Sequence, residues 1–183
     1  GFEITFLPVE KDGLINLKDL EEAFRDDTIL VSIMAANNEI GVLQPLAEIG
    51  AMCRQRNIIF HSDSAQAVGK IPLDVQGMNI DLMSLTAHKV YGPKGIGALY
   101  VRRRNPRVQL ASQLHGGGQE RGMRSGTLYT PQIVGFGKAV EIALETQSQE
   151  NAFITQLRQS LWEQLSQLGG IHLNGHPTQR LPG

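Results

Sequence analysis

Short apolar, β-branched runs alternate with stretches of helical periodicity, and this alternation constrains the fold more than any other feature of the sequence. The apolar character of residues 28–35 is almost continuous, which predicts a strand buried on both faces. Three further strands are expected at residues 57–60, 80–85 and 96–101. Strands that alternate with helices form a largely parallel sheet covered by those helices. The sequence therefore predicts an α/β fold with a mostly parallel sheet.

The expected helices carry recognisable start signals. Asn16 followed by Asp19 is typical of an N-cap with an acidic residue in the first turn, and Pro45 suits the first turn of a second helix. An apolar face follows Pro45, and Cys53 lies on it, so we expect this thiol to be buried and structural. That face consists of Leu46, Ile49, Met52 and Cys53.

The character of the sequence changes near Thr130. Pro131 opens a helical pattern that continues to about Leu168 and predicts one helix or a helix pair. Residues 171–173 then read as the first strand of another unit. We therefore expect part of a large domain in residues 1–129, and a linking helix with the start of a small domain in residues 130–183. The first residue is Gly1 rather than Met, so we expect a piece of a longer protein.

Composition excludes several classes of protein. The 183 residues carry 17 Lys+Arg against 18 Asp+Glu, a net charge of −1, which argues against nucleic-acid binding by bulk charge. The longest apolar run is too short to span a bilayer, so no membrane segment is expected. A single cysteine cannot form an internal disulfide, which favours a reducing compartment such as the cytoplasm.

Polar side chains follow three successive expected strands. In open α/β sheets, ligands bind at the carboxyl ends of the strands, so these groups predict a site. They are Asn38 after the first strand, Asp63 and Gln66 after the second, and Thr86, His88 and Lys89 after the third.

Lys89 is the informative member of this set. A lysine beside cationic or desolvating neighbours can act as an amine nucleophile and form a Schiff base with a carbonyl cofactor. Pyridoxal phosphate also needs an acidic group at its ring nitrogen, for which Asp63 is the candidate. Thr86 and His88 could bind phosphate. The alternatives are a solvated surface lysine and an aspartate that only caps a helix.

A second cluster at residues 115–127 contains three consecutive glycines, two arginines and a Ser-Gly-Thr sequence. Such a segment can bind anions, although it also fits a flexible surface hairpin. Other motifs fail on context. Residues 92–97 lack the order of a Walker loop or a dinucleotide-binding loop. His172 and His176 lie in a turn rather than on a helix, so we expect no metal site.

Together these segments resemble the cysteine desulfurases of the NifS/IscS group, within the class V aminotransferases and the fold-type I pyridoxal phosphate enzymes. The resemblance covers essentially the whole chain. The loop from Gly116 to Thr127 favours this group over the SufS-like one. The matching segments are residues 37–42, 61–70, 87–101 and 115–127.

The resemblance implies a role for each candidate residue. Lys89 would form the Schiff base with pyridoxal phosphate and move the substrate proton, and Asp63 would pair with the pyridine nitrogen. Thr86, which stands where the family usually has serine, would hold the phosphate together with His88. Asn38 and Gln66 would face the phenolic oxygen and the substrate, and Thr127 would reach the phosphate of the other subunit of a homodimer.

The implied reaction removes sulfur from L-cysteine, leaving alanine and an enzyme persulfide that is passed to iron–sulfur scaffold proteins. The family's acceptor cysteine lies beyond the last residue of this sequence, so we expect the chain alone to be inactive. Two alternatives stay open: another class V enzyme, such as a selenocysteine lyase, an aminotransferase or a kynureninase-like hydrolase, and a non-catalytic module that docks scaffold proteins.

Overall fold

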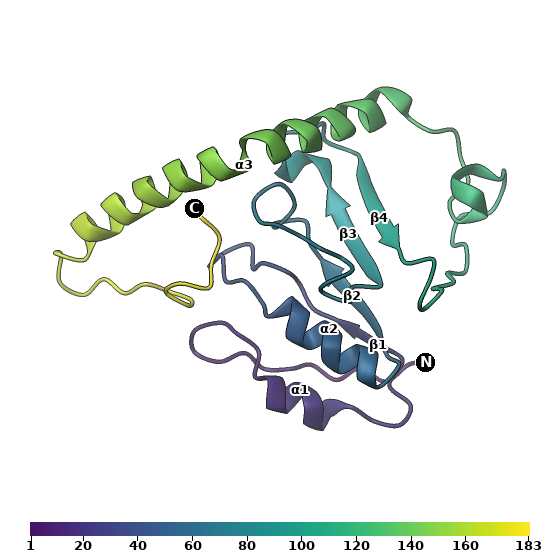
Figure 1. The fold of residues 1–183 in the computed structure, drawn as a ribbon, viewed down its shortest axis with the longest axis horizontal. Helices are drawn as coiled ribbons and strands as arrows, with labels where there is room; N and C mark the ends of the chain where they lie inside the picture. Colours follow the sequence, from purple (N-terminus) through teal and green to yellow (C-terminus); the bar gives the residue numbers. More distant parts are fainter.

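A four-stranded sheet with the order β1-β2-β3-β4 forms the centre of the computed structural model, which describes residues 1–183 (Figure 1). β1, β2 and β3 are parallel, whereas β4 runs antiparallel to β3. The predicted mostly parallel α/β fold is therefore confirmed. The strands are β1 (Leu30–Ser32), β2 (Ile59–Asp63), β3 (Leu82–Thr86) and β4 (Gly97–Val101).

The helices begin where the local signals predict. The Asn16 side chain caps α1 (Leu17–Ala23) by accepting a hydrogen bond from the Lys18 amide. Pro45 is the N-cap residue of α2 (Leu46–Gln55), whose Ile49 and Cys53 are buried against the sheet. Two short 3₁₀ helices, η1 (Ala87–Lys89) and η2 (Gln119–Gly122), and the long helix α3 (Thr130–Leu165) complete the fold. None of the three α-helices combines the length and the apolar composition that crossing a membrane requires.

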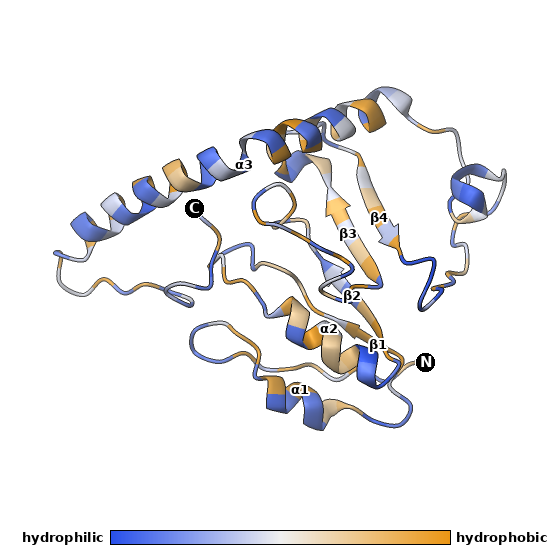
Figure 2. Ribbon diagram, in the orientation of Figure 1, coloured by the Kyte–Doolittle hydropathy of each residue, from blue (hydrophilic) through white to orange (hydrophobic).

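Only one face of β1 is covered, which corrects the prediction of a first strand buried on both faces. Side chains alternate between the two faces of a strand. Val31 and Phe60 point into the core beside α2, whereas Leu30 is 48 % exposed on the other face. Figure 2 shows apolar residues along the strands and on part of α2. The strand is also shorter than residues 28–35, because regular pairing with β2 covers only Leu30–Ser32.

α3 is one continuous helix rather than a helix pair, and it runs past the end of the sheet (Figure 1). Its first half packs against η1, where Phe136 is its one buried residue. The predicted strand at residues 171–173 is absent, since this stretch has no regular structure. The only ladder contact of the last segment is an isolated bridge between Val42 and Arg180.

Candidate functional site

The carboxyl ends of the three parallel strands meet at one edge of the sheet, as the sequence predicts. Main-chain hydrogen bonds continue past the strands, from the Ala35 amide to the Asp63 carbonyl (2.8 Å) and from the Ser64 amide to the Ser84 carbonyl (3.0 Å). Asp63 is the last residue of β2 and is exposed. One carboxylate oxygen accepts a hydrogen bond from the Ala65 amide (2.9 Å), and the other has no partner in the protein. Asp63 therefore has one free oxygen at this edge.

The end of β3 brings a hydroxyl and an imidazole together. The Thr86 hydroxyl lies 2.8 Å from Nδ1 of His88, which follows it on η1. No hydrogen bond uses Nε2 of His88, and this side chain is exposed. The pair therefore presents Nε2 of His88, which has no hydrogen-bond partner, beside the Thr86 hydroxyl, which is held by its contact with Nδ1.

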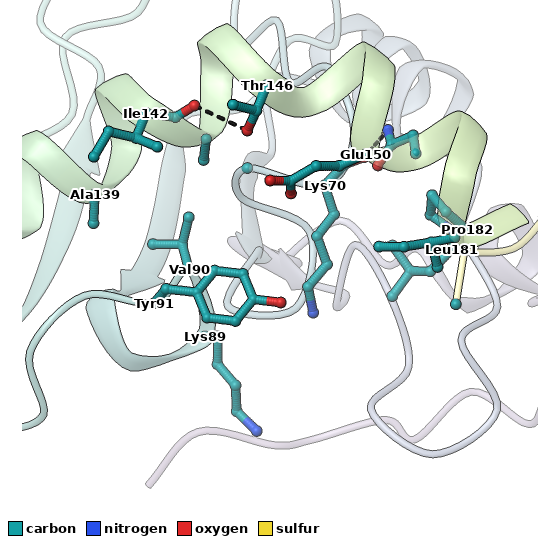
Figure 3. Close-up of a pocket in the computed structure, with 15 residues that line it drawn as sticks. Lys70, Lys89, Val90, Tyr91, Ala139, Ile142, Thr146, Glu150, Leu181 and Pro182 are labelled. Carbon is teal, nitrogen blue, oxygen red and sulfur yellow. Dashed lines mark hydrogen bonds between the residues drawn. The ribbon is translucent and has the colours of Figure 1, made fainter. Parts of the chain in front are cut away.

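Lys89 ends η1 and lines a cavity of about 260 Å³ beneath α3, the lysine cavity (Figure 3). A second lysine, Lys70, lines the same cavity. Burial lowers the pKa of Lys70, and the positive charge of Lys89 lowers it further. The remaining lining residues are Gly69, Val90, Tyr91, Ala139, Ile142, Ala143, Thr146, Glu150, Asn151, Ile154, Leu181, Pro182 and Gly183.

Two other predicted site residues, Asn38 and Thr127, are exposed and lie on loops outside the strands. Asn38 is exposed in the loop after β1, while the turn there is built by its neighbour Asn37, whose Oδ1 accepts hydrogen bonds from the amides of Glu39 and Ile40. Thr127 is exposed in the segment between β4 and α3, which projects from the rest of the chain (Figure 1). Neither side chain forms a hydrogen bond with another predicted site residue.

Sequence reasoning missed His61, which bridges all three parallel strands. Its Nδ1 lies 2.8 Å from the hydroxyl of Ser32 on β1, and its Nε2 lies 3.2 Å from the hydroxyl of Ser84 on β3. Burial lowers the pKa of His61, and the nearby charge of Asp63 partly offsets this effect. The signal was available, since His61 precedes Asp63 by two residues and so shares its face of β2.

Lys70 was also missed as a site residue. Its Nζ donates a hydrogen bond to Oε1 of Gln66, four residues earlier (3.3 Å). Gln66 is half-buried, and this bond connects it to the lysine cavity. The spacing of four residues could have indicated the contact, because residues 64–71 form turns with helix-like hydrogen bonds.

Comparisons with known proteins identify the family of this chain. The sequence matches the aminotransferase class-V family over residues 1–183. It is 57 % identical to the cysteine desulfurase IscS of Colwellia psychrerythraea over 183 residues, which is 100 % of this chain and 45 % of that protein. It is 59 % identical to a probable mitochondrial cysteine desulfurase of Schizosaccharomyces pombe, of which it covers 36 %. The chain thus spans less than half the length of these curated relatives.

Solved structures give the same result. A NifS-like protein superposes with a TM-score of 0.92 at 40 % identity, over 100 % of this chain and 49 % of its own. DndA from Streptomyces lividans superposes with a TM-score of 0.88 at 37 % identity, over 100 % of this chain and 51 % of its own. Since the family model matches residues 1–183 and the fold agrees with that of these structures, the chain belongs to the class-V aminotransferase family.

Proposed function

We propose that the chain supplies the lysine-bearing part of a pyridoxal phosphate-dependent cysteine desulfurase. The observation that carries this proposal is the position of Lys89, an exposed amine that lines a cavity just past the end of a parallel strand. The desulfurase names of relatives at 57 % and 59 % identity support the same reaction. The full reaction also needs groups from the part of the relatives' length that this chain does not cover.

The chemistry of the donor set fits the cofactor. An amine suits its carbonyl carbon, a carboxylate with a free oxygen suits a pyridinium nitrogen, and a hydroxyl beside an imidazole suits a phosphate. Lys89, Asp63, and Thr86 with His88 would hold it in these ways. Asn38 and Gln66 would donate to the phenolic oxygen, and Thr127 would reach the phosphate bound by the second subunit of a homodimer.

Pyridoxal phosphate, when bound, supplies an electron-withdrawing ring that stabilises negative charge on the substrate carbon. The chain's own residues orient the reactants and move protons. The Lys89 amine would act as the nucleophile toward the cofactor carbonyl and afterwards hold the proton taken from L-cysteine. The Asp63 carboxylate would keep the ring nitrogen protonated, because a neighbouring negative charge favours the charged form.

Cys53 is not suited to be the cysteine that accepts sulfur from the substrate. Cys53 is the only cysteine, it is 1 % exposed, and burial raises the pKa of its thiol to about 12. A thiol in this state is a poor nucleophile, because the thiolate is the reactive form. We therefore expect an acceptor cysteine elsewhere in the complete enzyme, with transfer to iron–sulfur scaffold proteins and a reducing compartment such as the cytoplasm.

The test is to add pyridoxal phosphate to the chain and reduce the product with borohydride. The product is expected to be yellow before reduction, and borohydride should convert it into a stable, colourless label that peptide mapping places on Lys89. Lys89→Ala should abolish this labelling. Lys94→Ala, which removes an exposed lysine of the same turn, should leave it unchanged. A colourless protein, or labelling spread over surface lysines, contradicts the proposal.

A second measurement addresses the reaction. The chain alone should release no alanine from cysteine, whereas the complete enzyme should do so only with Lys89 intact. Alanine release by the isolated chain that is lost in Lys89→Ala would disprove the assignment of the acceptor cysteine. Preference of the complete enzyme for selenocysteine or kynurenine would assign it to a different reaction of the family.

A further inference from the structure

Gln66, which would donate to the phenolic oxygen, forms a side-chain contact with Lys70, a residue to which the proposed reaction gives no role. The Lys70 ammonium lies 3.3 Å from the amide oxygen of Gln66, and both residues are partly buried. An ammonium group has three donors and no acceptor, so it can bind only the oxygen of an amide. The contact therefore fixes which end of the Gln66 amide faces Lys70 and leaves the nitrogen as the free donor.

The backbone of Lys70 is held from two sides. The Asn151 side chain on α3 donates to the Lys70 carbonyl (2.7 Å). The preceding residue, Gly69, has a φ of +73°, and a Cβ at that position would lie 2.6 Å from Val90 and 3.0 Å from Ala143. Lys70 is thus fixed between η1 and α3, and its side chain has a defined starting point.

Lys70 shares the lysine cavity with Lys89, and the two side chains extend in the same direction (Figure 3). Glu150 of α3 also lines this cavity, but it forms no ion pair with either lysine. Tyr91 is the remaining titratable group of the lining. The hydrogen bond that the Lys70 ammonium forms in the structure is the one with Gln66.

We propose that Lys70 is a positioning residue, which orients the Gln66 amide so that its nitrogen donates toward the ligand bound at Lys89. The inference rests on the proposed function, since it assigns Gln66 to that ligand. The lowered pKa of Lys70, caused by burial and by the charge of Lys89, agrees with an amine placed at this site rather than in solvent.

The orientation of Gln66 can be tested without cofactor. The side-chain amide of Gln66 is assigned by NMR in the wild-type chain and in Lys70→Met, Lys70→Arg and Lys138→Met. Lys138→Met is the control, because Lys138 is exposed on α3 and pairs only with Glu141. We expect the Gln66 amide signals to shift in Lys70→Met and to return toward wild type in Lys70→Arg, which keeps a charged donor. Unchanged signals in Lys70→Met overturn the inference.

A second measurement tests whether the contact between Lys70 and Gln66 affects ligand binding at Lys89. Binding of pyridoxal phosphate should weaken about tenfold in Lys70→Met, the size expected for a lost hydrogen bond to a charged group. The same substitution in a Gln66→Ala background should have almost no effect. An equal loss in both backgrounds overturns the inference. If the wild-type chain forms no adduct at Lys89, the proposed function fails, and the Gln66 amide signals still decide whether Lys70 orients this side chain.

Discussion

Asp81 and Arg102 form an ion pair that is almost completely withdrawn from solvent, with 2.9 Å between Oδ1 and Nε and exposed fractions of 2 % and 4 %. Arg54 of α2 contacts the same Asp81 oxygen, and the second oxygen accepts a hydrogen bond from the Phe60 amide (3.0 Å). Asp81 precedes β3 and Arg102 follows β4, so the pair joins two strands and α2 at the edge opposite Lys89.

Replacement of Asp81 by alanine should strongly destabilise the chain. It leaves the Arg102 charge buried without its partner, a loss of roughly 3–5 kcal/mol in the free energy of unfolding. Urea unfolding measures this change. The matched control is Glu22→Ala, which removes an exposed pair with Lys18 and should cost less than about 1 kcal/mol. Equal losses in the free energy of unfolding would show that the buried pair stabilises the fold no more than an exposed pair does.

Gly69→Ala should cost more stability than Gly170→Ala. Both glycines have a positive φ, +73° and +80°, so both substitutions carry backbone strain of about 1 kcal/mol or more. Only at Gly69 would the new methyl group also collide with Val90 and Ala143, which adds about 1–3 kcal/mol for overpacking. The difference between the two unfolding free energies isolates the steric contribution, and no difference would contradict the packing described for α3.

The Cys53 thiol should resist alkylation in the folded chain. Burial raises its pKa from 9.0 to about 12, so its thiolate fraction at pH 8 is about a thousandfold lower than that of a free cysteine. Because the folded chain holds the thiol proton more tightly than the unfolded chain, the protonated thiol favours folding. This contribution to the free energy of unfolding declines as the pH rises above 9. Mass spectrometry after iodoacetamide treatment should show modification in urea and almost none in buffer. Rapid labelling in buffer would mean that α2 opens readily.

Stability should fall as the pH decreases below about 6.5, partly because of His61. Burial lowers the pKa of this imidazole in the folded chain, so the unfolded chain takes up the proton first. The stabilisation is complete above pH 6.5 and is lost as the pH falls through the lowered value. Unfolding measured between pH 5 and pH 7 should show a smaller slope in His61→Gln. An unchanged slope in His61→Gln would contradict this role of the buried imidazole.

Local signals predicted much of the fold. Asn16, Pro45 and the periodicity after Pro131 mark helix starts, because capping and helical spacing depend on neighbours in the sequence. The apolar runs also indicated where the strands end, and so predicted that Asp63, Thr86 and Lys89 lie at the carboxyl ends of parallel strands. The open face of β1 was not predicted, because an apolar run such as residues 28–35 does not specify what covers each side of a strand. Residues 171–173 include two apolar side chains but pair with no strand, so they remain irregular.

The sequence predicts the residue types of the candidate site but not the contacts between them. The hydrogen bonds of His61 to Ser32 and Ser84 depend on the register between strands 23 to 29 residues apart in the sequence. The Lys70–Gln66 contact depends on a turn whose backbone is held by α3, far along the chain. Such pairings are products of tertiary packing, and no spacing rule for a single segment contains them.

The main-chain ladder around Asp63 has a consequence for how this protein can vary over evolutionary time. The carboxylate takes its position from peptide groups of Ala35 and Ser84 on the flanking segments, and peptide groups are shared by every amino-acid sequence. Side chains around it can therefore be exchanged without displacing it, provided the three strands still pair. Related proteins can therefore differ in the ligand that these side chains bind while the position of the carboxylate stays constant.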